Sequence, residues 1–171
     1  MIRLITLAAV IIGNFVLQTT AFQYIEILGV KPNTALILIC CYSIQRDDVE
    51  GALFGFFAGL LQDIYYESAV GMFAALGVLT GYICGKPLRS FYRENYFLPM
   101  LLVTVCSFVY QFVYYVSHFL FRGRTEFAFY FNTIILPGAI YTTVLTIPLF
   151  WFMYYINRLL ENFEKNKRRS L

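Results

Sequence analysis

Few residues in this chain have both a reactive side chain and a position that suits a functional site. The acidic residues are the first candidates. Asp63 is the acidic residue closest to an apolar stretch with regularly spaced glycines. A carboxylate inside a membrane is by default a functional candidate, because it could bind a cation, relay a proton or pair with a partner. The alternative is that Asp63 lies at the outer membrane interface and ends its helix. Glu50 begins the same stretch, where the positive end of a helix dipole is enough to explain a carboxylate.

The other candidate residues do not form a catalytic or metal-binding set. His118 is the single histidine, so a histidine-based metal cluster cannot form. No nucleophile motif is present, and the glycines are not followed by the Lys-Ser/Thr of a phosphate-binding loop. Four cysteines lie within apolar runs without a C-x-x-C pair, which favours small buried hydrophobic side chains over a metal site or a disulfide framework. These are Cys40, Cys41, Cys84 and Cys106. We expect no enzyme activity, no cofactor and no bound metal.

The composition excludes an ordinary soluble domain. Of the 171 residues, 60% are hydrophobic and only 13% are charged, and the mean hydropathy is +0.66. A soluble domain usually carries about 25% charged residues. Because there is too little polar surface to cover a water-facing globule, the sequence predicts an all-α integral membrane protein. The N-terminal run has no convincing cleavage site, so we expect it to be a first transmembrane helix and not a signal peptide.

Six apolar runs predict six transmembrane helices. They cover residues 4–18, 34–44, 51–65, 69–84, 96–121 and 127–156. The second run, even when extended to residues 32–45, would measure about 21 Å as a helix, whereas a hydrocarbon core is about 30 Å thick. We therefore expect this helix to span the membrane thinly, to be shielded by its neighbours or to be lengthened at its ends.

The distribution of basic residues predicts the topology. With six spans, both termini lie on the same side, and cytoplasmic loops normally carry the excess of Lys and Arg. If the termini are cytoplasmic, Lys31, Arg122 and Arg124 lie outside, and the other ten of the 13 basic residues lie inside. We therefore predict an N-in, C-in domain over residues 1–157 and a basic cytoplasmic tail over residues 158–171. The tail would lie against anionic lipid, and we expect no binding to nucleic acid.

Two series of glycines recur at four-residue spacing in the third and fourth runs. They are Gly51, Gly55 and Gly59, with Asp63 as the next step, and Gly77, Gly81 and Gly85. Small residues at this spacing let the backbones of membrane helices approach closely, at a crossing angle of about −40°. Our hypothesis is that the first series admits a helix of a partner protein and that Asp63 fixes its register.

Several short motifs, taken in order, resemble the rod shape-determining protein MreD family over nearly the whole chain. They are Leu17-Gln18-x-Thr20 with Phe22, Gly29-Val30-Lys31-Pro32, Glu50-Gly51-Ala52, Gly55-Phe56-x-Ala58-Gly59-Leu60-x-x-Asp63, Gly71, Gly81-Tyr82, and Leu136-Pro137 with Tyr141. Asn33 departs from the family, which often has Asp after the first proline. The resemblance adds Gly71 and Pro137 to the candidates for helix packing or partner contact.

The resemblance implies a non-enzymatic inner-membrane scaffold of the bacterial cell-elongation machinery. Members of this family work with the bitopic protein MreC, and indirectly with the actin homologue MreB, the glycosyltransferase RodA and a class B penicillin-binding protein. Their fold is similar to the six-helix substrate-binding subunits of energy-coupling-factor transporters. We therefore expect a protein that binds MreC and membrane lipid and helps to position peptidoglycan synthesis, so that rod shape is maintained.

A second function remains open at this point, namely a small-molecule-binding subunit of an energy-coupling-factor type transporter. Such a subunit would need an outward-facing polar pocket built from the later helices and outer loops. That region is mostly Phe and Tyr, and its few polar candidates are Gln111, His118 and Asn132.

Overall fold

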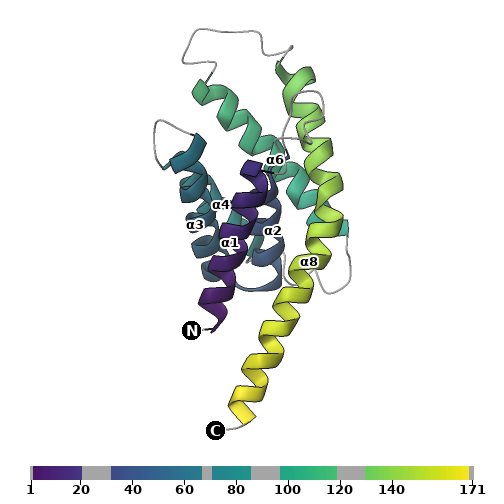
Figure 1. The fold of residues 1–171 in the computed structure, drawn as a ribbon. Coiled ribbons are helices and arrows are strands. Elements are labelled where there is room, and N and C mark those ends of the chain that lie inside the picture. The colour runs from purple at the N-terminus through teal and green to yellow at the C-terminus, as the bar shows by residue number, and fades with distance from the viewer. Residues whose placement is uncertain (1, 21–31, 67–70, 86–96, 119–129, 170–171) are drawn as a thin grey trace.

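The computed structural model describes residues 2–20, 32–66, 71–85, 97–118 and 130–169, and the regular secondary structure in this part of the chain is all helical (Figure 1). The helices are α1 (Ile2–Thr20), α2 (Thr34–Gln45), α3 (Asp48–Tyr66), α4 (Met72–Gly85), α6 (Phe97–His118) and α8 (Leu136–Arg169), with a π-helical turn η2 (Phe131–Ile135) before α8. These six α-helices follow the six predicted apolar runs in order, and the described residues contain no strand. The predicted basic loops at residues 86–93 and 122–124, and Lys31, fall outside the described residues.

The short helix α2 forms the centre of the bundle. Its residues 34–44 are all buried, and it contacts each of the other five α-helices. Figure 1 shows it behind α1, with α3 and α4 on one side and α8 on the other. A helix that is apolar all round belongs in an interior. The expectation that neighbouring helices shield this short segment is therefore confirmed.

Local hydrogen bonds explain where α2 begins and where its C-terminal end is held. Asn33 caps the helix, because its side-chain oxygen accepts from the backbone N–H of Leu36 at 3.1 Å. Just past the C-terminal end, Nε of Arg46 donates to Oδ1 of Asn157 in α8 at 2.7 Å. Near the same end, the hydroxyl of Tyr42 donates to Oε2 of Glu50 in the first turn of α3 at 3.2 Å. Side chains thus fix the C-terminal end of α2 to both α3 and α8.

The outer surface of the bundle is strongly apolar. Phe57 of α3, Leu79 of α4 and Trp151 of α8 are 55%, 55% and 65% exposed. Such extensive exposed apolar surface indicates contact with lipid or with other proteins. By length and composition, one helical stretch, Phe131–Leu160, is able to cross a membrane, and it reaches a mean hydropathy of 1.7. Four shorter apolar stretches accompany it, at Ile5–Thr20, Thr34–Gln45, Met72–Gly85 and Met100–Val113.

The last helix is longer than the sequence suggests. α8 continues to Arg169, so the predicted boundary between domain and tail at residue 157 falls within a continuous helix. Pro148 also lies inside this helix. In Figure 1 the C-terminal part of α8 extends beyond the other helices, and the start of α1 and the end of α8 lie toward the same end of the molecule.

Candidate functional site

The two glycine series of the sequence meet each other along the contact between α3 and α4. A Cβ atom on Gly55 would collide with the backbone carbonyl of Gly77, and a Cβ atom on Gly77 would collide with the carbonyl of Gly55. A Cβ on Gly81 would likewise collide with the carbonyl of Gly51, while a Cβ on Gly51 would meet the side chain of Ser43 in α2 first and the carbonyl oxygen of Gly81 at 2.9 Å. We call this contact the glycine seam. In it the two backbones touch directly, so α4 of the same chain covers the α3 stripe that we had assigned to a partner helix.

The ends of the glycine seam also consist of backbone contacts. A Cβ on Gly59 would lie 2.7 Å from the Cα of Ala74, and a Cβ on Gly85 would lie 2.5 Å from the Cα of Asp48. The seam therefore extends along nearly the full length of α4. Six of the predicted site residues are brought together here, namely Gly51, Gly55, Gly59, Gly77, Gly81 and Gly85.

Asp63 continues the seam by capping α4. Its two carboxylate oxygens accept hydrogen bonds from the backbone N–H groups of Phe73 and Ala74, both at 2.9 Å. These N–H groups belong to the first turn of α4, where they have no partner within the helix and where the helix dipole favours a negative charge. Asp63 itself is 0% exposed. The carboxylate thus fixes the register of α3 against α4 of the same chain.

Gly71 shapes the entrance to α4. Its φ of +124° lies in a region that residues with a side chain rarely adopt. A Cβ there would meet nothing within 4 Å, so backbone conformation is what requires glycine. The carbonyl of Gly71 accepts from the N–H of Ala75 at 2.9 Å, and the chain turns directly into the helix that Asp63 caps.

Tyr110 of α6 extends this cluster, and sequence reasoning did not identify it. Its hydroxyl donates to the carbonyl of Phe73 at 3.3 Å, and its ring stacks on the ring of Phe73 with centroids 5.6 Å apart. Tyr110 is 3% exposed. One tyrosine within an aromatic run carries no pattern that would have indicated this contact.

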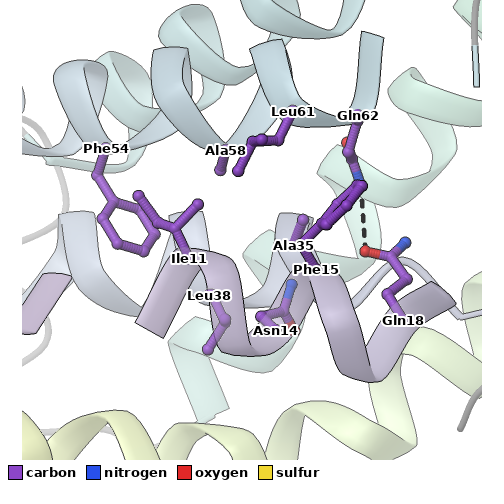
Figure 2. Close-up of a pocket in the computed structure, with 10 residues that line it drawn as sticks. All are labelled: Ile11, Asn14, Phe15, Gln18, Ala35, Leu38, Phe54, Ala58, Leu61 and Gln62. Atoms are coloured by element: carbon purple, nitrogen blue, oxygen red, sulfur yellow. Dashed lines mark hydrogen bonds between the residues drawn. The ribbon is translucent and has the colours of Figure 1, made fainter. Parts of the chain in front are cut away.

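A small pocket lies on the other side of α3, between α1, α2 and α3 (Figure 2). Asn14 and Gln18 of α1 line it, four residues apart in the same helix, and Gln18 is 7% exposed. Nε2 of Gln62 donates to Oδ1 of Asn33 at 3.2 Å and to Oε1 of Gln18 at 3.5 Å. The internal volume is about 10 Å³, which suits one water molecule.

Pro137 lies beside a distortion of the last helix. Proline has no N–H to donate to the carbonyl four residues earlier, and the preceding turn is widened so that the N–H of Leu136 donates to the carbonyl of Phe131. Gln111 of α6 completes this π turn. Oriented to satisfy both ends of its amide, Gln111 donates to the carbonyls of Ile134 (3.0 Å) and Ile135 (3.3 Å) and accepts from the N–H of Ala139 (3.3 Å).

The sequence offered two further polar candidates, Asn132 and His118. Asn132 is exposed at η2, and the side chain of His118 lies outside the part of the chain that the structure describes. Gln111 itself is engaged with the backbone of the π turn. Gln111 and Asn132 are therefore not gathered around a common cavity in the described residues.

Three of the four cysteines come together from three helices. The sulfur atoms of Cys40 in α2, Cys84 in α4 and Cys106 in α6 all lie within 4.8 Å of one another. Their separations along the chain follow no ligand-spacing pattern, so sequence reasoning treated them as separate hydrophobic residues. Cys41 is also buried but is not part of this group.

Comparison with known proteins gives one match. The model of the rod shape-determining protein MreD family matches residues 1–158. No curated protein and no solved structure matches the chain. The family match covers all the helices and the whole glycine seam, apart from the last turns of α8. The chain therefore belongs to the rod shape-determining protein MreD family.

Proposed function

We propose that this protein is a non-enzymatic scaffold of the bacterial cell-elongation machinery, which binds MreC and helps to position peptidoglycan synthesis. The observation that carries the proposal is the family match over residues 1–158, since membership suggests a role in determining rod shape. Within the described residues, the buried polar side chains hold helices together and do not form a catalytic arrangement. Asp63 caps a helix and Gln111 completes a π turn, so neither is aimed at a substrate.

The proposed location is the inner membrane, with six spans and both termini in the cytoplasm. The apolar side chains exposed on α3, α4 and α8 support contact with lipid. The excess of basic residues in the predicted cytoplasmic segments supports the orientation. The same six-helix plan underlies the proposed similarity to substrate-binding subunits of energy-coupling-factor transporters.

The proposed binding mechanism uses the outer faces of the helices, because α4 already covers the glycine seam. The seam and the Asp63 cap hold α3 and α4 as one rigid pair, whose outward side chains include Phe57 and Leu79. The transmembrane helix of MreC would pack against such an outer face. MreB, RodA and the class B penicillin-binding protein would be reached indirectly, through MreC.

The test is co-purification from native membranes combined with photo-crosslinking. A photoreactive phenylalanine is placed at one exposed position on each of four helices, namely Phe57, Leu79, Val109 or Trp151, which are each at least 50% exposed. Phe54, which is 4% exposed, is the matched buried control on α3. We expect MreC to co-purify and to form an adduct from one face, with none from position 54.

Two outcomes would contradict the scaffold proposal. The first is that MreC is not recovered with the tagged protein under conditions that keep it in the membrane extract. The second is recovery of a paired ATPase and its transmembrane coupling subunit, which would support the transporter alternative. The structure does not favour that alternative, because Gln111 and Asn132 do not line a common cavity within the described residues. The pocket beside Gln62, of about 10 Å³, suits one water molecule.

A further inference from the structure

The group of three thiols in the core is unusual in its geometry. Cys40 and Cys84 are 0% exposed, and Cys106 is partly exposed. The sulfur atoms of Cys40 and Cys84 are 3.8 Å apart, and all three sulfur atoms lie within 4.8 Å of one another. Because each sulfur comes from a different helix, the arrangement depends on the packing of α2, α4 and α6 and not on a local loop.

These distances match a metal–thiolate site. With metal–sulfur bonds of about 2.3 Å, two sulfur ligands of one ion lie about 3.8 Å apart in tetrahedral geometry and about 4.0 Å apart in trigonal geometry. The Cys40–Cys84 separation of 3.8 Å already has this value. No two of the three sulfur atoms are more than 4.8 Å apart. The sulfur of Cys106 would therefore have to move by less than 1 Å to bind the same ion as the other two.

The surroundings select the kind of ion. Cys40 and Cys84 belong to the apolar core cluster, and Cys106 packs against it. Hard ions such as Mg²⁺ and Ca²⁺ need oxygen ligands, whereas thiolates select soft ions such as Cu(I) and Zn²⁺. Structural Zn²⁺ sites are four-coordinate, while the group supplies three sulfur ligands. A soft monovalent ion accepts three sulfur ligands without a fourth.

We propose that Cys40, Cys84 and Cys106 form a binding site for a single soft monovalent metal ion of the Cu(I) type. The ion enters and remains as Cu(I), so no electron is transferred. Each thiol that binds as a thiolate releases its proton to solvent, so affinity rises with pH. Cys106 is the least buried of the three. Bound metal would tie α2, α4 and α6 together.

The experiment uses the full-length protein purified in detergent under reducing conditions. Ag(I), a soft monovalent ion that does not undergo redox chemistry with thiols, is titrated first, and Cu(I) is then supplied with a competing chelator. Metal retained after desalting is measured by mass spectrometry, and thermal unfolding is recorded with and without metal. The variants are Cys40→Ser, Cys84→Ser and Cys106→Ser, with Cys41→Ser as the matched control. Cys41 lies in the same helix and is equally buried.

We expect the wild type and Cys41→Ser to retain one ion per chain and to unfold at a higher temperature with metal, because the folded chain holds three sulfur atoms together and so binds the ion more tightly than the unfolded chain does. Each of the other variants should lose the ion and the thermal shift while keeping its monodisperse elution. If a variant fails to fold, a second measurement on the wild type is used in its place. Mass spectrometry then reads, for each cysteine, whether Ag(I) protects the thiol from alkylation. Equal retention by Cys84→Ser and the wild type would overturn the proposal, as would binding of Zn²⁺ in place of Ag(I) and Cu(I).

Discussion

The glycine seam makes a sharp prediction for the substitution Gly55→Ala. The added Cβ would lie 2.5 Å from the carbonyl carbon of Gly77, whereas ordinary contact begins at 3.4 Å. The helices must therefore separate by about 1 Å. A gap of this size loses roughly a quarter to a half of the attractive energy of each van der Waals contact across it. Overpacking of this kind costs about 1–3 kcal/mol. The upper end applies because the obstacle is backbone and not a flexible side chain.

A second effect of the same substitution opposes the first. Alanine favours a helix over glycine by about 1 kcal/mol, so the net loss of stability is about 2 kcal/mol. For a chain of this size, that corresponds to a fall in Tm of about 4–8 °C. Gly13→Ala is the matched control, since a Cβ on Gly13 of α1 would meet nothing within 4 Å. It should keep or raise the Tm.

The assay is thermal unfolding in detergent, followed by size-exclusion chromatography of heated samples of the wild type, Gly55→Ala and Gly13→Ala. The expected order of Tm is Gly13→Ala at or above the wild type, and Gly55→Ala below it. If Gly55→Ala is as stable as Gly13→Ala, the backbones of α3 and α4 are not in contact at this position. The glycine seam would then be refuted as the basis of the α3–α4 pair.

Four further substitutions, at three positions, test neighbouring features in the same assay. Asp63→Ala leaves the N–H groups of Phe73 and Ala74 without their acceptor and should lower stability by about 2–4 kcal/mol. Asp63→Asn keeps one acceptor oxygen and should lower stability by less. Equal Tm values for Asp63→Ala and the wild type would contradict the cap. Gly71→Ala should cost about 1–2 kcal/mol because φ is +124°, and an unchanged Tm would show that the turn tolerates a side chain. Gln111→Leu should cost about 1–3 kcal/mol by leaving the π-turn backbone without its partner, and retained stability would mean that the π turn does not depend on Gln111.

The sequence predicted the helices better than it predicted their partners. Apolar runs set the order and approximate bounds of the helices, because burial and lipid contact both demand hydrophobic stretches. The spacing of Gly51, Gly55 and Gly59 predicted a close helix contact. It could not say which helix makes that contact, since a stripe of glycines fits any backbone of the right angle. The structure shows that the second glycine series, in α4, makes this contact.

The predictions for single polar residues were less complete for a physical reason. Asp63 has the same chemistry whether it binds a cation, pairs with a partner or caps a helix, and only the position of the Phe73 and Ala74 N–H groups decides among these. The contacts of Tyr110, Gln111 and the three cysteines join residues from different helices. Such contacts depend on the tertiary packing of α2, α4, α6 and α8. Residues that meet only in this way form no local pattern in the sequence.

The cap between Asp63 and α4 also bears on how the protein is made. In the membrane arrangement proposed above, α3 on its own would place three glycines and an uncompensated carboxylate in lipid. An aspartate costs about 2.5–3.5 kcal/mol at the centre of an inserting helix, and less in the last turn, where Asp63 lies. The compensating N–H groups arrive only with α4, a few residues later in synthesis. We therefore expect the translocon to release α3 and α4 together as a helical hairpin, with the ribosome already past residue 74 when α3 leaves the channel.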